Sequence, residues 1–103
     1  MKNSTYHIFF NNLANKLKID IILSLREKEK SVSELIKDLN VEQSKVSHSL
    51  LSLKNCNIVN FKQKGKQRIY FLNKQTILPM LKLIDKHSKI HCNGNCKFCK
   101  REK

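Results

Sequence analysis

Glycine and proline are scarce in this sequence, which has two glycines and one proline among 103 residues. We find no internal repeat and no long linker, and the length leaves room for one domain with a modest core. No apolar run approaches the ~18 residues that span a bilayer, and the N-terminus leads into no secretory hydrophobic segment. We therefore expect a single domain that acts in the cytoplasm and has no membrane partner.

Acidic residues are also few. Eight Asp and Glu stand against 21 Lys and Arg, which gives a formal net charge of +13. Five of the eight acids fall within residues 27–42, whereas residues 54–70 carry five basic residues and no acid. Such an excess of positive charge is costly unless a polyanion shares the surface, and nucleic acid is the usual one. A merely solvated basic surface is the alternative that the composition leaves open.

Groupings typical of catalysis are missing too. Nothing in the sequence forms a nucleophile–base pair or a phosphate cradle. Asp20, Asp38 and Asp85 are interpreted as charges on helix surfaces. We therefore expect that the protein is not an enzyme.

Helical periodicity dominates the first fifty residues. Apolar spacing predicts one helix around residues 6–13 and a second around residues 17–25, which ends in the charged run 26–30. Ser31 and Glu34 fit a capping box at the start of a short third helix.

The third helix is expected to stop at Asn40, because asparagine tolerates the left-handed backbone of a tight turn. A fourth helix is predicted from about Gln43 to Lys54. The apolar residues expected to be buried on it are Val46, Leu50 and Leu53. Two short helices joined by such a turn form a helix-turn-helix.

The sequence pattern changes from helical to strand-like after residue 57. The β-rich runs 58–63 and 67–72 flank Gly65 and predict a hairpin. A last helix is expected over about residues 74–89, with Pro79 bending it near its first turns. The predicted fold is α+β, mostly α: a winged helix-turn-helix with about five helices and a two-stranded hairpin wing.

Polar side chains lie opposite the buried stripe of the fourth helix on a helical wheel. Those assigned to DNA contact are Gln43, Ser44, Lys45, Ser47, His48 and Ser52. Short or planar polar groups suit a helix that enters the major groove. The wing adds Lys64, Lys66 and Arg68, whose targets are phosphates or the minor groove. Leu51 lies off the buried stripe, and the pattern does not explain it.

Four segments match the residues of one regulator family in the same order. They are Leu17-Lys18-Ile19-Asp20-Ile21-Ile22-Leu23, Ser31-Val32-Ser33-Glu34-Leu35, Gln43-Ser44-Lys45-Val46-Ser47-His48-Ser49-Leu50 and Lys64-Gly65-Lys66-Gln67-Arg68-Ile69-Tyr70-Phe71-Leu72. These segments resemble the ArsR-type metal-sensor and stress-regulator family. Asn40 and Asn57 stand where that family usually has glycine, and Asn can take the same backbone conformation.

The resemblance implies a homodimer joined through the first and last helices. It also implies repression by occupying an operator in double-stranded DNA, relieved when an effector binds; two-fold symmetry makes that operator a palindrome. The residues that fall on the family's base-reading positions are Gln43, Ser44, Ser47 and His48.

The metal sites usual in that family are not kept. One site needs a cysteine pair in the third helix, and residues 31–40 contain no soft ligand. The second uses positions that correspond here to Lys74, Thr76, His87 and Ile90. Of these only His87 can ligate a metal, and one imidazole does not make a site.

Thiols gather instead in a basic tail, residues 91–103, which follows the DNA-binding and dimerisation domain of residues 1–90. The predicted metal ligands there are His91, Cys92, Cys96 and Cys99. Three thiolates suit zinc, cadmium, an iron–sulfur cluster or arsenite, and a fourth ligand is available from His91, His87, Cys56 or the partner subunit. Reduced, disordered thiols and a disulfide redox switch are the competing interpretations.

The function expected from these features is a sequence-specific DNA-binding transcriptional regulator. Its lead form is a repressor released by a metal, metalloid or redox effector. The alternative is a constitutive or architectural DNA-binding protein with a structural metal or none.

Overall fold

The computed structural model describes residues 3–92, in two units that divide after Asn73 and are treated separately. The first unit contains α1 (Asn3–Leu13), α2 (Lys16–Glu27), β1 (Lys30–Ser31), α3 (Val32–Leu39), α4 (Gln43–Asn55), β2 (Val59–Lys64) and β3 (Gln67–Leu72). The second contains α5 (Ile77–His87) and a π-helical turn, η1 (Ser88–Cys92). Within the described residues, five α-helices and the β2–β3 hairpin confirm the predicted winged helix-turn-helix fold.

The hairpin belongs to an antiparallel three-stranded sheet with the order β1-β3-β2. Val59 pairs with Leu72 at its open end, and Lys64 pairs with Gln67 beside the loop. Gly65 has a φ of 64° there, in the left-handed region that glycine enters without a steric penalty. The sequence predicted two strands and missed β1, because a strand of two residues is too short to show a period.

Four polar residues shape the starts and ends of helices as their chemistry predicts. Ser31 and Glu34 form both hydrogen bonds of the capping box at the start of α3. Asn40 ends α3 with φ 55° and ψ 50°, and Asn57 has a φ of 58° between α4 and β2. The two asparagines therefore supply the backbone conformation for which glycine is the usual choice.

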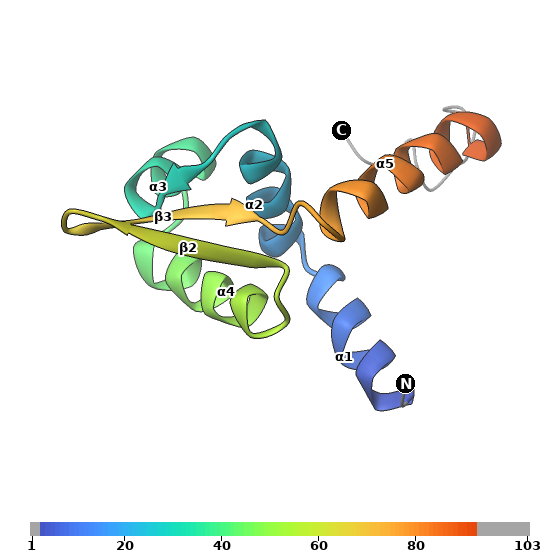
Figure 1. The fold of residues 1–103 in the computed structure, drawn as a ribbon, viewed down its shortest axis with the longest axis horizontal. Coiled ribbons are helices and arrows are strands. Elements are labelled where there is room, and N and C mark those ends of the chain that lie inside the picture. The colour runs from blue at the N-terminus through green and yellow to red at the C-terminus, as the bar shows by residue number, and fades with distance from the viewer. Residues whose placement is uncertain (1–2, 93–103) are drawn as a thin grey trace. The chain divides into compact units, whose positions relative to one another are not determined.

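The core of the first unit lies between α2, α3, α4 and the hairpin. Its buried apolar residues are Ile21, Ile22, Leu25, Leu35, Val46, Leu50, Leu53, Ile58, Val59, Tyr70 and Leu72. Figure 1 shows the three helices gathered around the hairpin, whose loop projects past them. Burial of one side of α4 in this core leaves its opposite side exposed.

In the second unit, α5 begins at Ile77, three residues after the predicted start at residue 74. Pro79 is the third residue of α5, in the first turn, where a missing N–H breaks no intrahelical hydrogen bond. Proline therefore fits the start of this helix instead of bending its interior. No helix in residues 3–92 is both long and apolar enough to span a membrane. The predicted boundary at residue 91 remains a prediction, since residues 93–103 lie outside the described part.

Candidate nucleic-acid interface

The exposed face of α4 carries most of the side chains predicted to read DNA. Core packing buries Val46, Ser49, Leu50 and Leu53, on one side of the helix. The predicted contact residues that are exposed are Gln43, Ser44, Lys45, Ser47 and His48. The first turn holds no acidic residue, and among the described residues no side chain caps its backbone N–H groups. The start of α4 therefore offers free donors and a partial positive charge.

Ser52 lies on a different side of α4 from these residues. It is half-buried, and its hydroxyl donates to Asn12 Oδ1 at 2.7 Å. Lys18 Nζ donates to the same Asn12 oxygen at 2.7 Å and to Ser52 Oγ at 3.1 Å. The hydroxyl of Ser52 is thus hydrogen-bonded inside the protein, and its contact with DNA stays a prediction.

The amide of Asn12 completes this network between α1, α2 and α4. It donates to the backbone oxygen of Ser52 at 3.2 Å and to the sulfur of Cys56 at 2.8 Å. Asn12 is the one described residue of α1 that is buried. No pattern in the sequence indicated this role, because a single polar residue on an amphipathic helix is ordinarily assigned to the solvent side.

The wing carries three exposed cations, Lys64, Lys66 and Arg68. The guanidinium of Arg68 lies 4.5 Å from the centre of the Phe61 ring, and Lys54 Nζ from α4 lies 5.5 Å from it. This aromatic ring therefore brings the wing and the end of α4 together. Lys62 is different, because its ammonium forms a 2.8 Å ion pair with Glu29.

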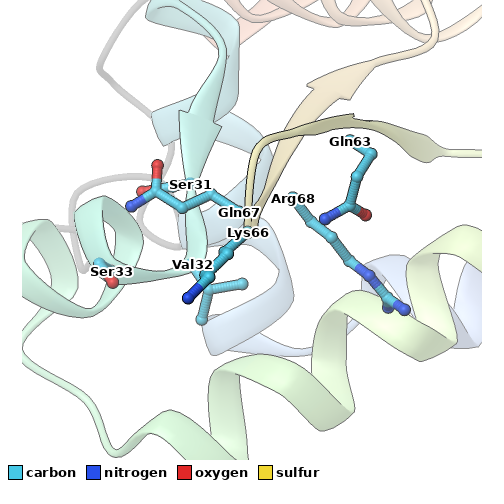
Figure 2. A pocket seen from close by; sticks show the side chains of 7 residues that line it. All are labelled: Ser31, Val32, Ser33, Gln63, Lys66, Gln67 and Arg68. Carbon is cyan, nitrogen blue, oxygen red and sulfur yellow. The ribbon is translucent and has the colours of Figure 1, made fainter.

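A groove of about 430 Å³ runs between the hairpin and the start of α3 (Figure 2). It is lined by Ser31, Val32, Ser33, Gln63, Lys66, Gln67 and Arg68. The lining is polar and carries two cations, and in the described part of the chain no carboxylate pairs with either of them. Such a groove suits a phosphate of the DNA backbone.

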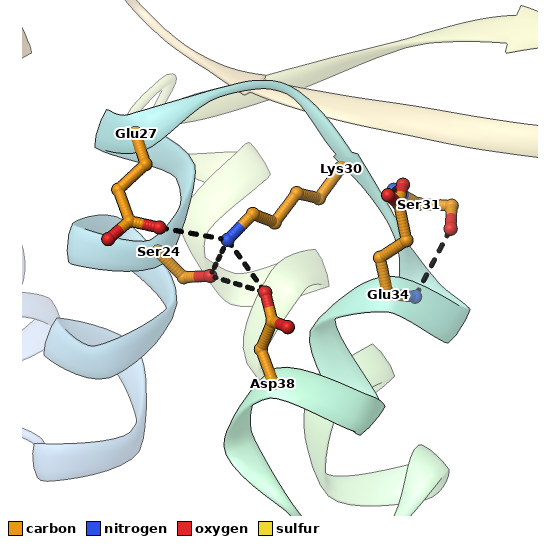
Figure 3. Close-up of polar contacts among 6 residues, drawn as sticks. All are labelled: Ser24, Glu27, Lys30, Ser31, Glu34 and Asp38. Atoms are coloured by element: carbon orange, nitrogen blue, oxygen red, sulfur yellow. Dashed lines mark hydrogen bonds and ion pairs between the residues drawn. The ribbon is translucent and has the colours of Figure 1, made fainter.

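A buried lysine connects α2, β1 and α3 (Figure 3). Lys30 is only 4% exposed, although it belongs to the charged run of residues 26–30. Its ammonium donates to Asp38 Oδ2 at 2.6 Å, Ser24 Oγ at 2.7 Å and Glu27 Oε1 at 3.3 Å. These contacts join α2, β1 and α3, and they hold α2 and α3 together.

The ionisation of this cluster follows from its hydrogen bonds. The bond between Lys30 and Asp38 is the main cause that raises the pKa of Lys30 and lowers the pKa of Asp38. The backbone N–H of Ser31 likewise lowers the pKa of Glu34 by donating to its carboxylate. All three groups are therefore held in their charged forms around neutral pH.

The predicted metal ligands are largely beyond the described residues. Cys96 and Cys99 lie outside them, and the side chain of Cys92 is not described. His91 is exposed, with its ring 4.7 Å from that of His87. Within residues 3–92, no three His, Cys, Asp or Glu side chains converge on one point. The tail site remains a prediction from the sequence.

A polar recognition face next to a cationic hairpin defines a winged helix-turn-helix protein. Residues 15–60 match the family model described as bacterial regulatory protein, arsR family. This match confirms, for residues 15–60, the resemblance to the ArsR-type family expected from the sequence.

A bacterial transcriptional regulator is among the known proteins similar to this chain. The transcriptional activator HlyU of Vibrio cholerae is 26% identical over 88 residues, which cover 85% of this chain and 79% of HlyU. Its solved structure matches with a TM-score of 0.73 at 24% identity, covering 89% of this chain and 99% of that one.

Two mycobacterial structures are also similar. Rv0081 of M. tuberculosis has a TM-score of 0.76 at 28% identity, over 85% of this chain and 90% of that chain. Mb0332 of Mycobacterium bovis is described as a homodimeric winged helix-turn-helix DNA-binding domain and a possible ArsR-family regulator. Its TM-score is 0.75 at 20% identity, over 85% of each chain.

Proposed function

We propose that the protein is a cytoplasmic, sequence-specific DNA-binding transcriptional regulator that binds a palindromic operator as a homodimer. The observation that carries this proposal is the exposed polar face of α4 beside the exposed cations of the wing. Gln43, Ser44, Ser47 and His48 have the side chains that bond base edges in the major groove. Lys45 and the wing cations serve phosphate contacts, which position the protein without reading sequence.

A dimer is supported by the apolar residues that both units leave in solvent. Those at least half exposed on α1 are Tyr6, Ile8 and Phe10, and those on α5 and η1 are Leu83, Ile84 and Ile90. Clusters of exposed apolar residues on a small protein mark interaction surfaces. Mb0332, a fold neighbour, is described as homodimeric. Two-fold symmetry sets half-sites about one helical turn, ~34–36 Å, apart.

The dimer can be tested by sedimentation velocity on the full chain. Phe10→Lys with Ile84→Lys is expected to give a monomer with unchanged helical content, because charge at an apolar interface is unfavourable. A wild-type protein that stays monomeric at tens of micromolar and on DNA contradicts the dimer.

Base reading by α4 is tested with duplexes selected from a random library by the full-length protein. Ser47→Ala with His48→Ala is expected to lower the preference for the selected duplex over random duplex roughly 10-fold or more. Leu23→Ala changes an exposed residue of α2, outside the reading face and the proposed dimer helices, and serves as the control. Selectivity that survives the α4 double substitution rules out this reading role.

We also propose that an effector acting at the tail, through His91, Cys92, Cys96 and Cys99, releases the protein from its operator. Support comes from the thiol spacing, since thiolates bind soft metals and arsenite and also oxidise readily. Zinc, cadmium, arsenite and peroxide should each be titrated into a gel shift with wild type and with the three tail cysteines replaced by serine. A binding curve that no addition moves favours the alternative, a constitutive DNA-binding protein with a structural metal or none.

The direction of control is proposed as repression, in which the bound dimer blocks the promoter. HlyU carries the name of an activator, so the opposite direction needs its own measurement. Transcription in vitro from a promoter that contains the selected operator distinguishes the two. Less transcript with added protein supports repression, and more transcript contradicts it.

A further inference from the structure

One apolar side chain lies on the proposed DNA-reading face of α4. Leu51 is 58% exposed, whereas the other apolar residues of this helix, Val46, Leu50 and Leu53, are buried. It follows Ser47 by four residues and His48 by three, and residues at these spacings are neighbours on a helix surface. Leu51 therefore extends the reading face by one turn.

The neighbouring residue shows that this orientation is set by the fold. Ser52 is drawn inward by its hydrogen bonds to Asn12 and Lys18. Successive helical residues are rotated by about 100°, so holding Ser52 inward places Leu51 on the outer face. Long helical side chains also lean toward the N-terminus of their helix, which directs Leu51 toward the turn of Ser47 and His48.

Exposure of one leucine has no special meaning, because folded proteins leave many single apolar residues in solvent. Its position among base-reading polar residues is what requires a partner. The major-groove edge of DNA presents one distinctive apolar group, the 5-methyl group of thymine, and apolar side chains recognise it. A hydrogen-bond donor or acceptor cannot do so.

We propose that Leu51 contacts the 5-methyl group of a thymine in each half-site and is a specificity-determining residue. This inference rests on the proposed DNA-binding function. Polar neighbours fix which bases are bonded, and Leu51 adds a preference for thymine that depends on one methyl group. Loss of a buried methyl group corresponds to about fourfold in affinity.

The test uses the selected operator duplex with each thymine of one half-site replaced in turn by uracil, which lacks only that methyl group. At one thymine, wild-type protein is expected to lose about fourfold in affinity. Leu51→Ala should bind the thymine and uracil duplexes equally at that position, and Leu51→Met should keep the difference. Alanine and methionine are both good helix formers, so the helix is retained.

Leu23→Ala is the matched control, because Leu23 is a leucine of similar exposure, 47%, on α2. This variant is expected to lose the same affinity as wild type when each thymine is replaced by uracil. If wild-type protein binds selectively but loses no affinity when any thymine is replaced by uracil, the proposed role of Leu51 is wrong and the proposed DNA-binding function still stands. That role is equally overturned if Leu51→Ala keeps the full uracil loss, or if it changes only the oligomeric state. Absence of any selective DNA binding by wild type instead overturns the proposed function itself.

Discussion

Lysine has opposite roles in two regions of this protein. Lys30 is 4% exposed and its ammonium is bonded to Asp38, Ser24 and Glu27. Lys64 and Lys66, in the wing, are exposed, and the ion pairs of the described residues do not include them. The first lysine is satisfied by its own chain, and the other two are left for an external anion.

The difference shows that counting charges locates a function only roughly. A buried ammonium loses its hydration and must be given partners inside the fold. Exposed cations close together repel one another, and a polyanion relieves that repulsion. Substitutions in the two regions should therefore separate stability from DNA affinity.

The largest effect is expected from the triple substitution Lys64→Gln, Lys66→Gln and Arg68→Gln. Removing one cation that binds a phosphate lowers the salt slope by about one, so affinity at 0.1 M salt should fall on the order of 100-fold or more for the three together. Thermal stability should change little. Fluorescence anisotropy across a salt series measures the affinity, and an unchanged salt slope contradicts a phosphate role for the wing.

Substitutions around Lys30 should show the reverse pattern. Asp38→Ala leaves the buried ammonium without its main partner and is expected to lower the melting temperature. Lys30→Met removes the charge itself and should stay within about 1 kcal/mol of wild type, since apolar replacement of a buried charge is often neutral. Both variants should bind DNA with normal affinity once folded. The comparison fails if Lys30→Met is the less stable of the two.

The pH dependence of stability gives a further test of the buried cluster around Lys30. The pKa of Asp38 is lower in the folded protein than its ordinary value of 3.8, so its ionised form stabilises the fold above that pH. This contribution is lost as the pH falls through the folded pKa. The pKa of Lys30 is raised above 10.5, so its contribution is complete below that pH and is lost as the pH rises through the folded pKa. Asp38→Asn should therefore give a flatter decline in melting temperature below about pH 4 than wild type does. An equally steep decline in the variant would show that other carboxylates control acid unfolding.

Local signals in the sequence predicted most of the helical framework correctly. The capping box at Ser31 and the left-handed Asn40 are local features, so they could be recognised without tertiary information. The apolar spacing likewise identified the buried side of α4, because apolar residues that recur with the helical period lie on one face of the helix.

The sequence was uninformative where a distant segment decides the environment of a side chain. Lys30 belongs to a charged run, and only its pairing with β3 and its contact with Asp38 make it buried. Leu51 and Ser52 are consecutive on α4, and the hydrogen bond of Ser52 to Asn12, forty residues earlier, holds Ser52 inward while Leu51 is exposed. The spacing of apolar residues along α4 does not show which of these two side chains faces outward.

The smallest effect is expected at Lys62, which has features of both regions. It lies on the hairpin, but Glu29 already neutralises it through a 2.8 Å ion pair between partly exposed side chains. Lys62→Gln should therefore change stability by less than about 1 kcal/mol, as exposed pairs do, and should weaken DNA binding less than Lys64→Gln does. Glu29→Gln should release the ammonium of Lys62 and strengthen binding a few-fold at low salt, with the gain disappearing at high salt because screening removes it. The double variant should show no such gain. If Lys62→Gln instead costs as much affinity as Lys64→Gln, then pairing within the protein does not determine which cations bind DNA.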